Sequence, residues 1–284
     1  MKIAGLASNR GRNLCHLADA APGGAEPSVV LTNREGAPVL EAAAERRIRT
    51  EVVVRGDDES RASHERRILD RLSAYDVDLV CLDGYMRVLT DEFLDAAPTT
   101  LNVHPSLLPA FPGTDAHEQA LAAGVRTTGC TVHVVTEAVD DGPIVTQEPV
   151  PVYEDDDVAA LERRVLHEAE FVAYPRAVRW FATGDATVVT GDDGTPESVR
   201  TDGDTGGAFP ARRFVSEDRT ASLRYGENPH QDAALYADPA CEEPNVVGAA
   251  QLNPGAKAMG YNNYNDADAA LGLVTEFADP AAAV

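Results

Sequence analysis

The central part of the chain contains Leu101-Asn102-Val103-His104-Pro105-Ser106-Leu107-Leu108-Pro109, an apolar run that ends at a proline. If residues 101–104 form a strand, Asn102 and His104 point to the same side, because side chains alternate along a strand. Pro105 has no N–H to donate and ends the ladder there. We therefore expect an amide and an imidazole side by side at the carboxyl end of a strand. An amide N–H can stabilise an oxyanion and an imidazole can transfer a proton. A structural histidine, satisfied by local hydrogen bonds, is the alternative.

Strand and helix patterns alternate on both sides of this segment. Strand patterns occupy Lys2–Ser8, Ser28–Asn33, Glu51–Arg55, Val77–Leu82, Leu101–His104 and Gly129–Thr136. Helical patterns occupy Asn13–Ala21, Ala37–Arg46, Glu59–Ser73 and Asp156–Gly184. This alternation predicts an α/β fold with a doubly wound, mainly parallel sheet and a small C-terminal extension. Such sheets bind ligands beyond the carboxyl ends of their strands, where His104 is expected.

A glycine separates the first expected strand from the first helix, in Ser8-Asn9-Arg10-Gly11-Arg12-Asn13-Leu14. Backbone N–H groups at such a position can approach a phosphate, which the helix dipole also favours. An ordinary strand-to-helix turn is the alternative, because one glycine is a weak signal.

An acidic turn, Val139-Asp140-Asp141-Gly142-Pro143, follows the strand pattern at residues 129–136. Turn formation alone explains this composition. A carboxylate beside His104 would also stabilise the protonated imidazole and relay protons through water. The pattern leaves Asp140 and Asp141 as equal candidates.

The charge of the chain constrains its partners. Its 284 residues carry a formal charge of −23, and its lysines are Lys2 and Lys257 alone. Such a surface argues against binding nucleic acid. It suits a halophile's cytoplasm, where salt screens self-repulsion, although an ordinary acidic enzyme is the alternative.

No apolar run is long enough for a membrane span, and the N-terminus lacks the pattern of a signal peptide. We therefore expect a cytoplasmic protein with no membrane partner.

Cysteine and histidine spacing gives no sign of a metal site. The four cysteines are scattered and form no C-x-x-C pair, at Cys15, Cys81, Cys130 and Cys241. Nor do histidines and carboxylates cluster at metal-ligand spacing, so no metal is expected. His117 and His133 lie nearest the expected site in sequence, and His133 is interpreted as structural because it alternates with apolar neighbours.

Composition divides the chain into three parts. Residues 1–189 carry the strand and helix patterns and are expected to form the catalytic domain. Residues 190–212 are acidic and rich in glycine, which predicts a solvated linker. Residues 213–284 regain apolar content but are few for an independent domain.

Taken together, these motifs resemble the folate-dependent phosphoribosylglycinamide formyltransferases of purine biosynthesis. The similarity spans roughly residues 1–187 and rests on Ser8–Leu14, Asp83–Leu89, Leu101–Gly113 and Val139–Pro143. It implies formyl transfer from 10-formyltetrahydrofolate, as co-substrate, to the amine of 5-phosphoribosylglycinamide.

The resemblance also implies residue roles. Asn102 and His104 would act on the formyl group, and Asp140, rather than Asp141, takes the aspartate position of the family. Gly11, Arg12 and Asn13 would cradle the phosphate of the ribonucleotide, and Glu170 would contact the same substrate. Folate would be bound by Arg61, Met86, Arg87, Val88, Leu89 and Asn102.

Three positions depart from the family pattern. Asn9 replaces the usual glycine, Arg12 replaces a small residue, and Asp115 stands where many relatives carry histidine. Backbone recognition of phosphate tolerates the first two changes, and Arg12 would add positive charge. The change at Asp115 alters the environment of the expected site.

The tail resembles the start of the aminoimidazole carboxamide ribonucleotide transformylase domain. The matching segments are Leu223–Gln231, Tyr261–Asn263 and Asp266–Leu271. In that family a catalytic Lys-His pair follows the region that ends here at Val284. We therefore expect a fusion fragment or remnant without the second activity. Other enzymes of purine biosynthesis, or the remainder of a transformylase domain, are the expected protein partners.

Two other functional classes fit parts of the pattern. A formyltetrahydrofolate hydrolase or a methionyl-tRNA formyltransferase would share the Asn, His and Asp set, although the acidic surface disfavours tRNA. A non-catalytic folate- or nucleotide-binding scaffold is the other alternative, and a turnover assay separates it from an enzyme.

Overall fold

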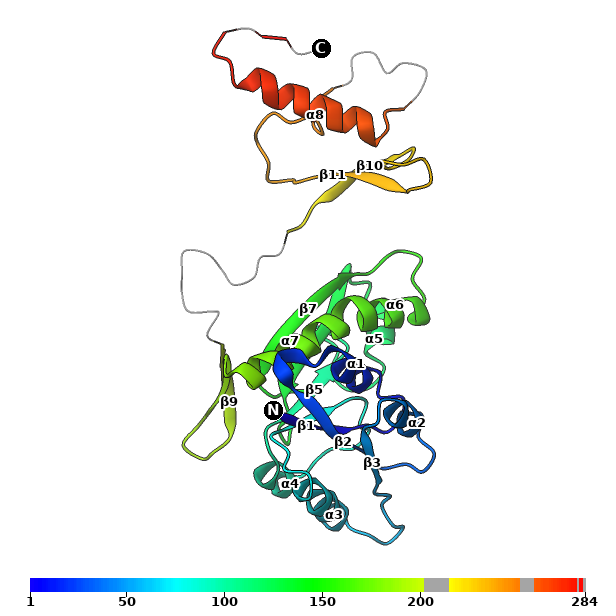
Figure 1. Ribbon diagram of the computed structural model, residues 1–284, viewed down its shortest axis with the longest axis vertical. Helices are drawn as coiled ribbons and strands as arrows, with labels where there is room; N and C mark the ends of the chain where they lie inside the picture. Colours follow the sequence, from blue (N-terminus) through cyan, green and yellow to red (C-terminus); the bar gives the residue numbers. More distant parts are fainter. Residues whose placement is uncertain (202–214, 251–257, 280, 283–284) are drawn as a thin grey trace. The chain divides into compact units, whose positions relative to one another are not determined.

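A seven-stranded sheet forms the centre of the first of two units, residues 1–210 and 211–284, into which the chain divides (Figure 1). The computed structural model describes residues 1–201, 215–250, 258–279 and 281–282. The strands are β1 (Lys2–Leu6), β2 (Glu26–Thr32), β3 (Arg49–Val52), β4 (Leu79–Leu82), β5 (Thr100–His104), β6 (Thr127–Val134) and β7 (Ile144–Pro151). Their order in the sheet is β3-β2-β1-β4-β5-β6-β7. Strands β1 to β5 are parallel, whereas β6 and β7 add an antiparallel edge.

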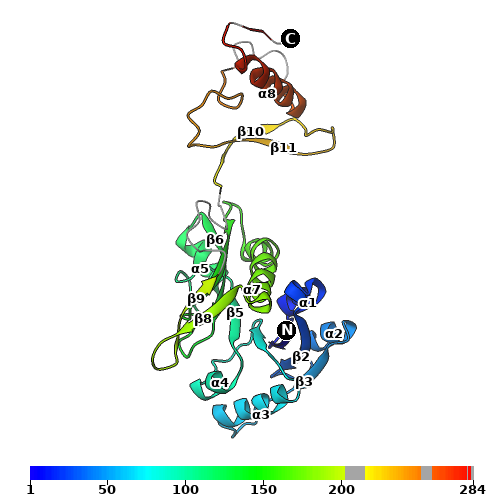
Figure 2. The same ribbon diagram turned by 60° about the vertical axis from the view of Figure 1, so that its left-hand side comes forward.

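Helices cover both faces of this sheet (Figures 1 and 2). They are α1 (Arg12–Ala20), α2 (Pro38–Glu45), α3 (Arg61–Ser73), α4 (Asp91–Ala96), α5 (Ala116–Ala123), α6 (Val158–Arg164) and α7 (Phe171–Thr183), with a 3-10 turn η1 (Pro22–Gly24) and a π-helical turn η2 (Val165–Glu170). Helices α1, α2 and α7 lie against one face, and α3 and α4 against the other. The alternation of side chains explains this division, since Cys81 of β4 packs with the first group of helices and Val80 with the second.

The winding of the chain brings several loops to one place. From β1 the chain builds outward through β2 and β3, and it then returns to place β4 on the other side of β1. The point between β1 and β4, where the order reverses, is where doubly wound sheets bind ligands. The loops after β1, β4 and β5 all leave the sheet at this edge, so the structure confirms the predicted fold class and places the expected motifs there.

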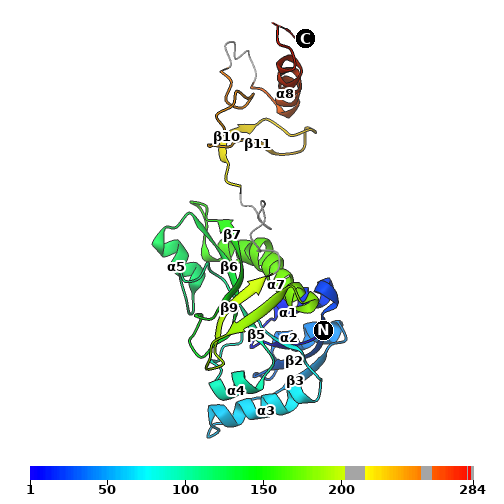
Figure 3. The same cartoon turned by 90° about the vertical axis from the view of Figure 1, so that its left-hand side faces the viewer.

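Two segments differ from the sequence-based expectation. The helix predicted over residues 156–184 is divided into α6, η2 and α7, and Pro175 lies inside α7. The predicted linker at residues 190–212 contains a strand, at residues 196–201. Strand β9 (Pro196–Thr201) pairs with β8 (Ala186–Thr190) in a hairpin (Figures 2 and 3). Its Val188 and Val199 pack against the core. Residues 202–212 of that linker lie outside the described residues.

The second unit is small. It contains a hairpin of β10 (Asp218–Leu223) and β11 (Ala233–Ala237) and the helix α8 (Tyr261–Thr275). No residue of α8 is buried. Across the described part of both units, no helix has the length and apolar character needed to cross a membrane.

One buried hydroxyl links α7 to two strands of the site. The hydroxyl of Tyr174, which is fully buried, lies 2.9 Å from the carbonyl oxygen of Leu82 and 3.2 Å from that of Leu101. We expect Tyr174→Phe to lower the free energy of unfolding by about 1–2 kcal/mol, because these contacts are lost inside the core. Urea unfolding measures this change. The matched control is Tyr153→Phe at an exposed ring, and equal stability of the two variants would contradict the assignment.

Candidate active site

A cavity of about 660 Å³ opens beside the carboxyl ends of β4 and β5. Apolar side chains line much of it, among them Leu82, Val88, Leu89, Val135 and Val139. Polar side chains also line it: Asn102, His104, His117, His133, Asp140 and Glu162. The cavity therefore combines an apolar wall with a concentration of acid, base and amide groups.

Asn102 and His104 lie on β5 as the sequence predicted, and both line the cavity. Asn102 lies opposite His133 in the antiparallel register of β5 and β6. Its Nδ2 is 3.2 Å from His133 Nε2. His133 in turn contacts the carbonyl oxygen of Val134 through Nδ1, at 3.0 Å. Nε2 faces both the Asn102 amide and the Asp140 carboxylate, so it accepts from Asn102 when unprotonated and donates to Asp140 when it carries a proton.

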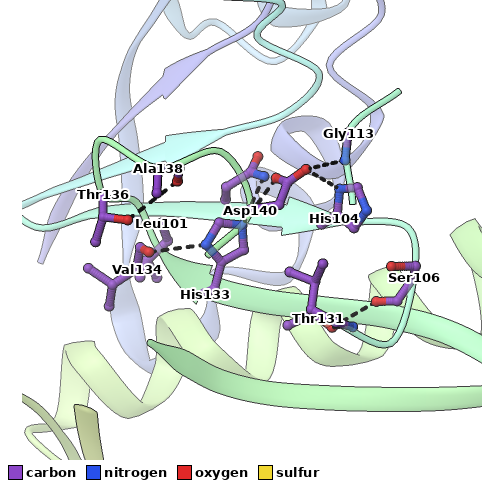
Figure 4. A network of polar contacts seen from close by, with 12 residues as sticks. Leu101, His104, Ser106, Gly113, Thr131, His133, Val134, Thr136, Ala138 and Asp140 are labelled. Carbon is purple, nitrogen blue, oxygen red and sulfur yellow. Dashed lines mark hydrogen bonds and ion pairs between the residues drawn. The ribbon is translucent and has the colours of Figure 1, made fainter. Parts of the chain in front are cut away.

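The carboxylate of Asp140 lies between the two histidines (Figure 4). Its Oδ2 is 3.2 Å from His104 Nδ1, and its Oδ1 is 3.7 Å from His133 Nε2. The N–H of Gly113 donates to the same Oδ2 at 2.8 Å. Asp140 has a φ of 53°, a left-handed conformation that aspartate tolerates better than most residues. Its neighbour Asp141 is exposed.

The surroundings of Asp140 favour its ionised form. Burial alone would raise the pKa of Asp140, but the interactions with His133, with the Gly113 N–H and with His104 outweigh it and lower the pKa below its ordinary value. The site therefore holds a carboxylate anion at neutral pH.

His104 faces two oxygen acceptors. Its Nδ1 points to Asp140, and its Nε2 lies 2.8 Å from the carbonyl oxygen of Phe111. Both contacts are hydrogen bonds only when the ring carries both protons. The geometry thus suits an imidazole that holds a proton and delivers it.

The residues of the expected phosphate site form a second group, beside this cavity rather than in its lining. Gly11 has a φ of 59°, and a Cβ there would lie 2.4 Å from Val39 Cγ2, so glycine is required. Arg12 forms an ion pair with Glu162 at 2.5 Å, and Glu162 lines the cavity. This pair connects the two groups.

The N-terminus of α1 is already occupied by a carboxylate. The backbone N–H groups of Asn13 and Leu14 donate to Asp83 Oδ2, at 2.7 and 3.2 Å. These two helix N–H groups therefore have an acceptor within the protein. They are not free to receive a phosphate while Asp83 accepts from them.

Glu170 lies at the end of η2, where it accepts a hydrogen bond from Asn13 Nδ2 at 2.6 Å. Burial raises the pKa of Glu170 to about 7. The hydrogen bond from Asn13 opposes the shift, and the charge of Asp83 adds to it. A carboxyl group beside the expected phosphate site thus titrates near neutral pH.

Most of the residues expected to bind folate line the cavity, but Arg61 does not. Met86, Arg87, Val88 and Leu89 line the cavity, and Met86 is 66% exposed. Ser8 Oγ accepts from the N–H of Met86 at 2.9 Å and so fixes this loop to the end of β1. Arg61, in contrast, is exposed at the start of α3 and does not line the cavity.

Three residues that line the cavity received no functional role from the sequence: His117, His133 and Glu162. His133 was interpreted as structural, yet it contacts Asn102 and Asp140. The Nε2 of His117, in α5, is buried without a hydrogen-bond partner among the described residues, and burial lowers the pKa of His117. Glu162 gave no signal in its helical pattern. Asp115, the position that departs from the family, also lines the cavity.

The described residues contain no group of three histidine, cysteine or carboxylate side chains that could hold a metal ion.

Comparison with known proteins agrees with a site built for acyl-group chemistry. Residues 1–178 match the family described as formyl transferase. The chain belongs to the formyl transferase family. Residues 192–284 match a second family, described as AICARFT/IMPCHase bienzyme.

Relatives with known functions lie in the same family. The phosphoribosylglycinamide formyltransferase of Haemophilus influenzae is 37% identical over 187 residues, which are 64% of this chain and 88% of that protein. The trifunctional purine biosynthetic protein adenosine-3 of Drosophila melanogaster is 39% identical over 193 residues, or 66% of this chain. The chain spans only 14% of that longer protein. The crystal structure of glycinamide ribonucleotide transformylase 1 from Symbiobacterium toebii superposes with a TM-score of 0.65 at 42% identity, covering 71% of this chain and 93% of that one.

The two neighbouring aspartates provide a matched pair for testing the site. We expect Asp140→Asn to lower kcat by about 10²–10³-fold, because a neutral amide cannot balance a protonated His104. Asp141→Asn, at an exposed position of the same turn, should stay within about twofold of the wild type. Steady-state formyl transfer measures both. Equal losses in the two variants, or the reverse order, would show that the aspartates are misassigned.

Proposed function

We propose that the first unit transfers the formyl group of 10-formyltetrahydrofolate to the amine of 5-phosphoribosylglycinamide, a step of purine biosynthesis. The observation that carries the proposal is the meeting of Asn102, His104 and Asp140 at one end of the cavity. The similarity to phosphoribosylglycinamide formyltransferases over nearly their whole length supports the same substrates.

The cavity suits the folate co-substrate. Its apolar wall, with Val88 and Leu89, offers contact to a flat heterocycle, and the backbone of residues 84–89 adds polar groups. Met86 is exposed and available for contact with a ligand. When bound here, 10-formyltetrahydrofolate supplies an activated formyl carbon. We therefore assign Met86, Arg87, Val88, Leu89 and Asn102 to folate binding.

Arg61 lies outside the cavity lining, so any contact it makes with folate is peripheral. Its side chain is exposed on α3, away from the cavity lining. An arginine at such a position can reach only a part of the folate that extends beyond the cavity. The role we propose for Arg61 is a charge interaction with an acidic end of that molecule.

The second group of residues suits the ribonucleotide. Gly11 takes the left-handed conformation that turns successive backbone N–H groups toward an anion, and Arg12 supplies positive charge. Asn13 and Glu170 offer an amide and a carboxyl group for the ribose. The Arg12–Glu162 pair joins this group to the cavity, so a ribonucleotide bound by its phosphate can direct its amine toward His104.

In the proposed mechanism Asn102 donates a hydrogen bond to the formyl oxygen as the amine attacks the formyl carbon. Negative charge develops on that oxygen, and a fixed amide stabilises it. His133 holds the amide in position through its contact with Asn102 Nδ2.

Proton movement falls to His104 and Asp140. His104 donates a proton toward the departing nitrogen of the folate, and the Asp140 carboxylate stabilises the protonated ring before transfer. Asp140 also accepts, through water, the proton that the attacking amine loses.

Three reactions with the same formyl donor test the proposal against its alternatives. The chain is incubated with 10-formyltetrahydrofolate and either the ribonucleotide, methionyl-tRNA or buffer alone. We expect formylation of the ribonucleotide only. Formate release without an acceptor would identify a hydrolase, formylation of tRNA would identify the other transferase, and no turnover would support a binding scaffold. The charge of −23 argues against a polyanionic tRNA.

His104→Ala separates chemistry from binding. We expect kcat to fall by about 10²–10⁴-fold, because the proton donor is lost. The Kd for the ribonucleotide, measured by calorimetry, should change little, since its proposed phosphate site lies in the other group of residues. A variant that turns over at nearly the wild-type rate would remove His104 from its role.

The boundary of the catalytic unit can be tested by truncation. A chain that ends at Pro210 should retain formyl transfer, because every assigned residue lies between Gly11 and Glu170. A chain that ends at Val189 loses β9 and its contacts with the core, so we expect a lower melting temperature. Loss of transfer by the folded 1–210 chain, judged by circular dichroism, would contradict the boundary.

The C-terminal segment and the acidic surface have proposed roles outside the active site. We propose that residues 213–284 represent part of a transformylase domain and that the remainder of such a domain is a partner. The acidic surface supports function in a salt-rich cytoplasm, because salt screens its self-repulsion. Formyl transfer should then increase from low to multimolar salt, and a maximum at low salt would contradict a halophilic role.

A further inference from the structure

Helix α1 begins at a residue that cannot cap it. The first N–H groups of a helix need acceptors, and an Asn, Asp, Ser or Thr side chain at the N-cap commonly supplies one. Here the N-cap is Gly11, whose positive φ and close approach to Val39 require glycine. The geometry that suits the phosphate loop therefore leaves α1 without a cap of its own.

Asp83 supplies the missing acceptor from another part of the chain. It follows β4 directly, and β4 lies beside β1 in parallel register, with Leu82 paired to Leu6. Its Oδ2 accepts from the N–H groups of Asn13 and Leu14, at 2.7 and 3.2 Å. These are the second and third residues of α1, whose N–H groups an N-cap side chain normally satisfies.

The other oxygen of Asp83 extends the contact to Glu170. Asn13 Nδ2 lies 3.3 Å from Asp83 Oδ1 and 2.6 Å from Glu170 Oε2, so one amide bridges two carboxyl groups. Asn13 is 2% exposed and Glu170 9% exposed. The Oδ1 of Asn13 is buried and has no hydrogen-bond partner among the described residues. The amide of Asn13 is therefore fixed by its Nδ2 contacts alone.

We propose that Asp83 is a positioning residue for the ribonucleotide. Its carboxylate caps α1 in place of Gly11 and holds Asn13 against Glu170, so that the surface expected to bind phosphate and ribose is formed before the substrate arrives. The inference rests on the proposed function for its substrate. It also places the phosphate on the loop before α1, because Asp83 occupies the N–H groups of Asn13 and Leu14.

The same contacts make ribonucleotide binding depend on pH. Asp83, Glu162, Arg12 and Asn13 are the charged and polar groups that act on Glu170. Burial raises the pKa of Glu170 to about 7, and the charge of Asp83 contributes to that shift. An ionised Glu170 accepts hydrogen bonds from ribose hydroxyls better than a protonated one. Binding should therefore weaken as the pH falls through about 7.

Two substitutions at Asp83 separate geometry from charge. Asp83→Ala removes the cap, and we expect KM and Kd for the ribonucleotide to rise about tenfold, which corresponds to about 1.4 kcal/mol. The kcat and the KM for the folate should stay within about twofold. Asp83→Asn keeps one oxygen for the two N–H groups, so it should recover much of the affinity.

The pH dependence of ribonucleotide binding distinguishes this role of Asp83 from a purely structural one. Asp83→Asn removes a negative charge beside Glu170, so the pH at which ribonucleotide binding is half-maximal should shift to a lower value. The control is Asp95→Asn, an exposed residue of α4, which loses the same charge and should leave the profile unchanged.

Calorimetry with glycinamide ribonucleotide, on the full chain from pH 5.5 to 8.5, is the experiment. Equal affinity in the wild type and Asp83→Ala, or an unshifted profile in Asp83→Asn, overturns the inference. So does a parallel loss of kcat and of affinity for both substrates. A wild type that binds the ribonucleotide without transferring formyl refutes the proposed function alone, and one that does not bind it refutes both.

Discussion

The carboxylate of Asp140 connects the parts on which the site depends. It contacts His104 of β5 and His133 of β6, and it accepts a hydrogen bond from Gly113 in the loop between them. Strand β5, the loop after it and strand β6 thus meet at one anion. The cost of burying this charge is balanced by these contacts, which is why the pKa of Asp140 is lowered despite burial.

A second constraint comes from the winding of the sheet. Because β4 lies beside β1, the loops that follow these strands touch each other. Ser8 holds Met86, Asp83 caps α1, and Arg12 pairs with Glu162 at the edge of the cavity. The groups proposed to bind folate and ribonucleotide are therefore parts of one connected structure, in which rigid strands place reactive groups on short loops.

Local patterns in the sequence were sufficient to predict the parallel sheet and the pair on β5. The alternation of side chains put Asn102 and His104 on one side, and a proline marked the end of the strand. Asp140 and Asp141 could not be separated by physics, since both lie in one turn. Their different burial, visible only in the folded chain, separates them. The hairpin of β8 and β9 was missed because its three valines, Val188, Val189 and Val199, are outnumbered by the acidic and glycine residues around them.

Other features depend on contacts that no local pattern records. His133 alternates with apolar residues like any core side chain, and its contact with Asn102 follows only from the register of β5 and β6. Asp83 precedes a glycine and resembles an ordinary turn residue, yet it caps a helix far away in sequence. Arg61 is the opposite case, because resemblance assigned it to folate binding and the fold places it outside the cavity lining.

Formyl transfer here requires that one cavity bring the amine and the formyl group together between Asn102 and His104. A crystal structure with glycinamide ribonucleotide and a non-transferable folate analogue would show this arrangement. We expect the phosphate at Gly11, the heterocycle against residues 86–89, and the amine within about 3–3.5 Å of the carbon that corresponds to the formyl group. Ligands bound elsewhere, or an amine directed away from His104, would contradict it.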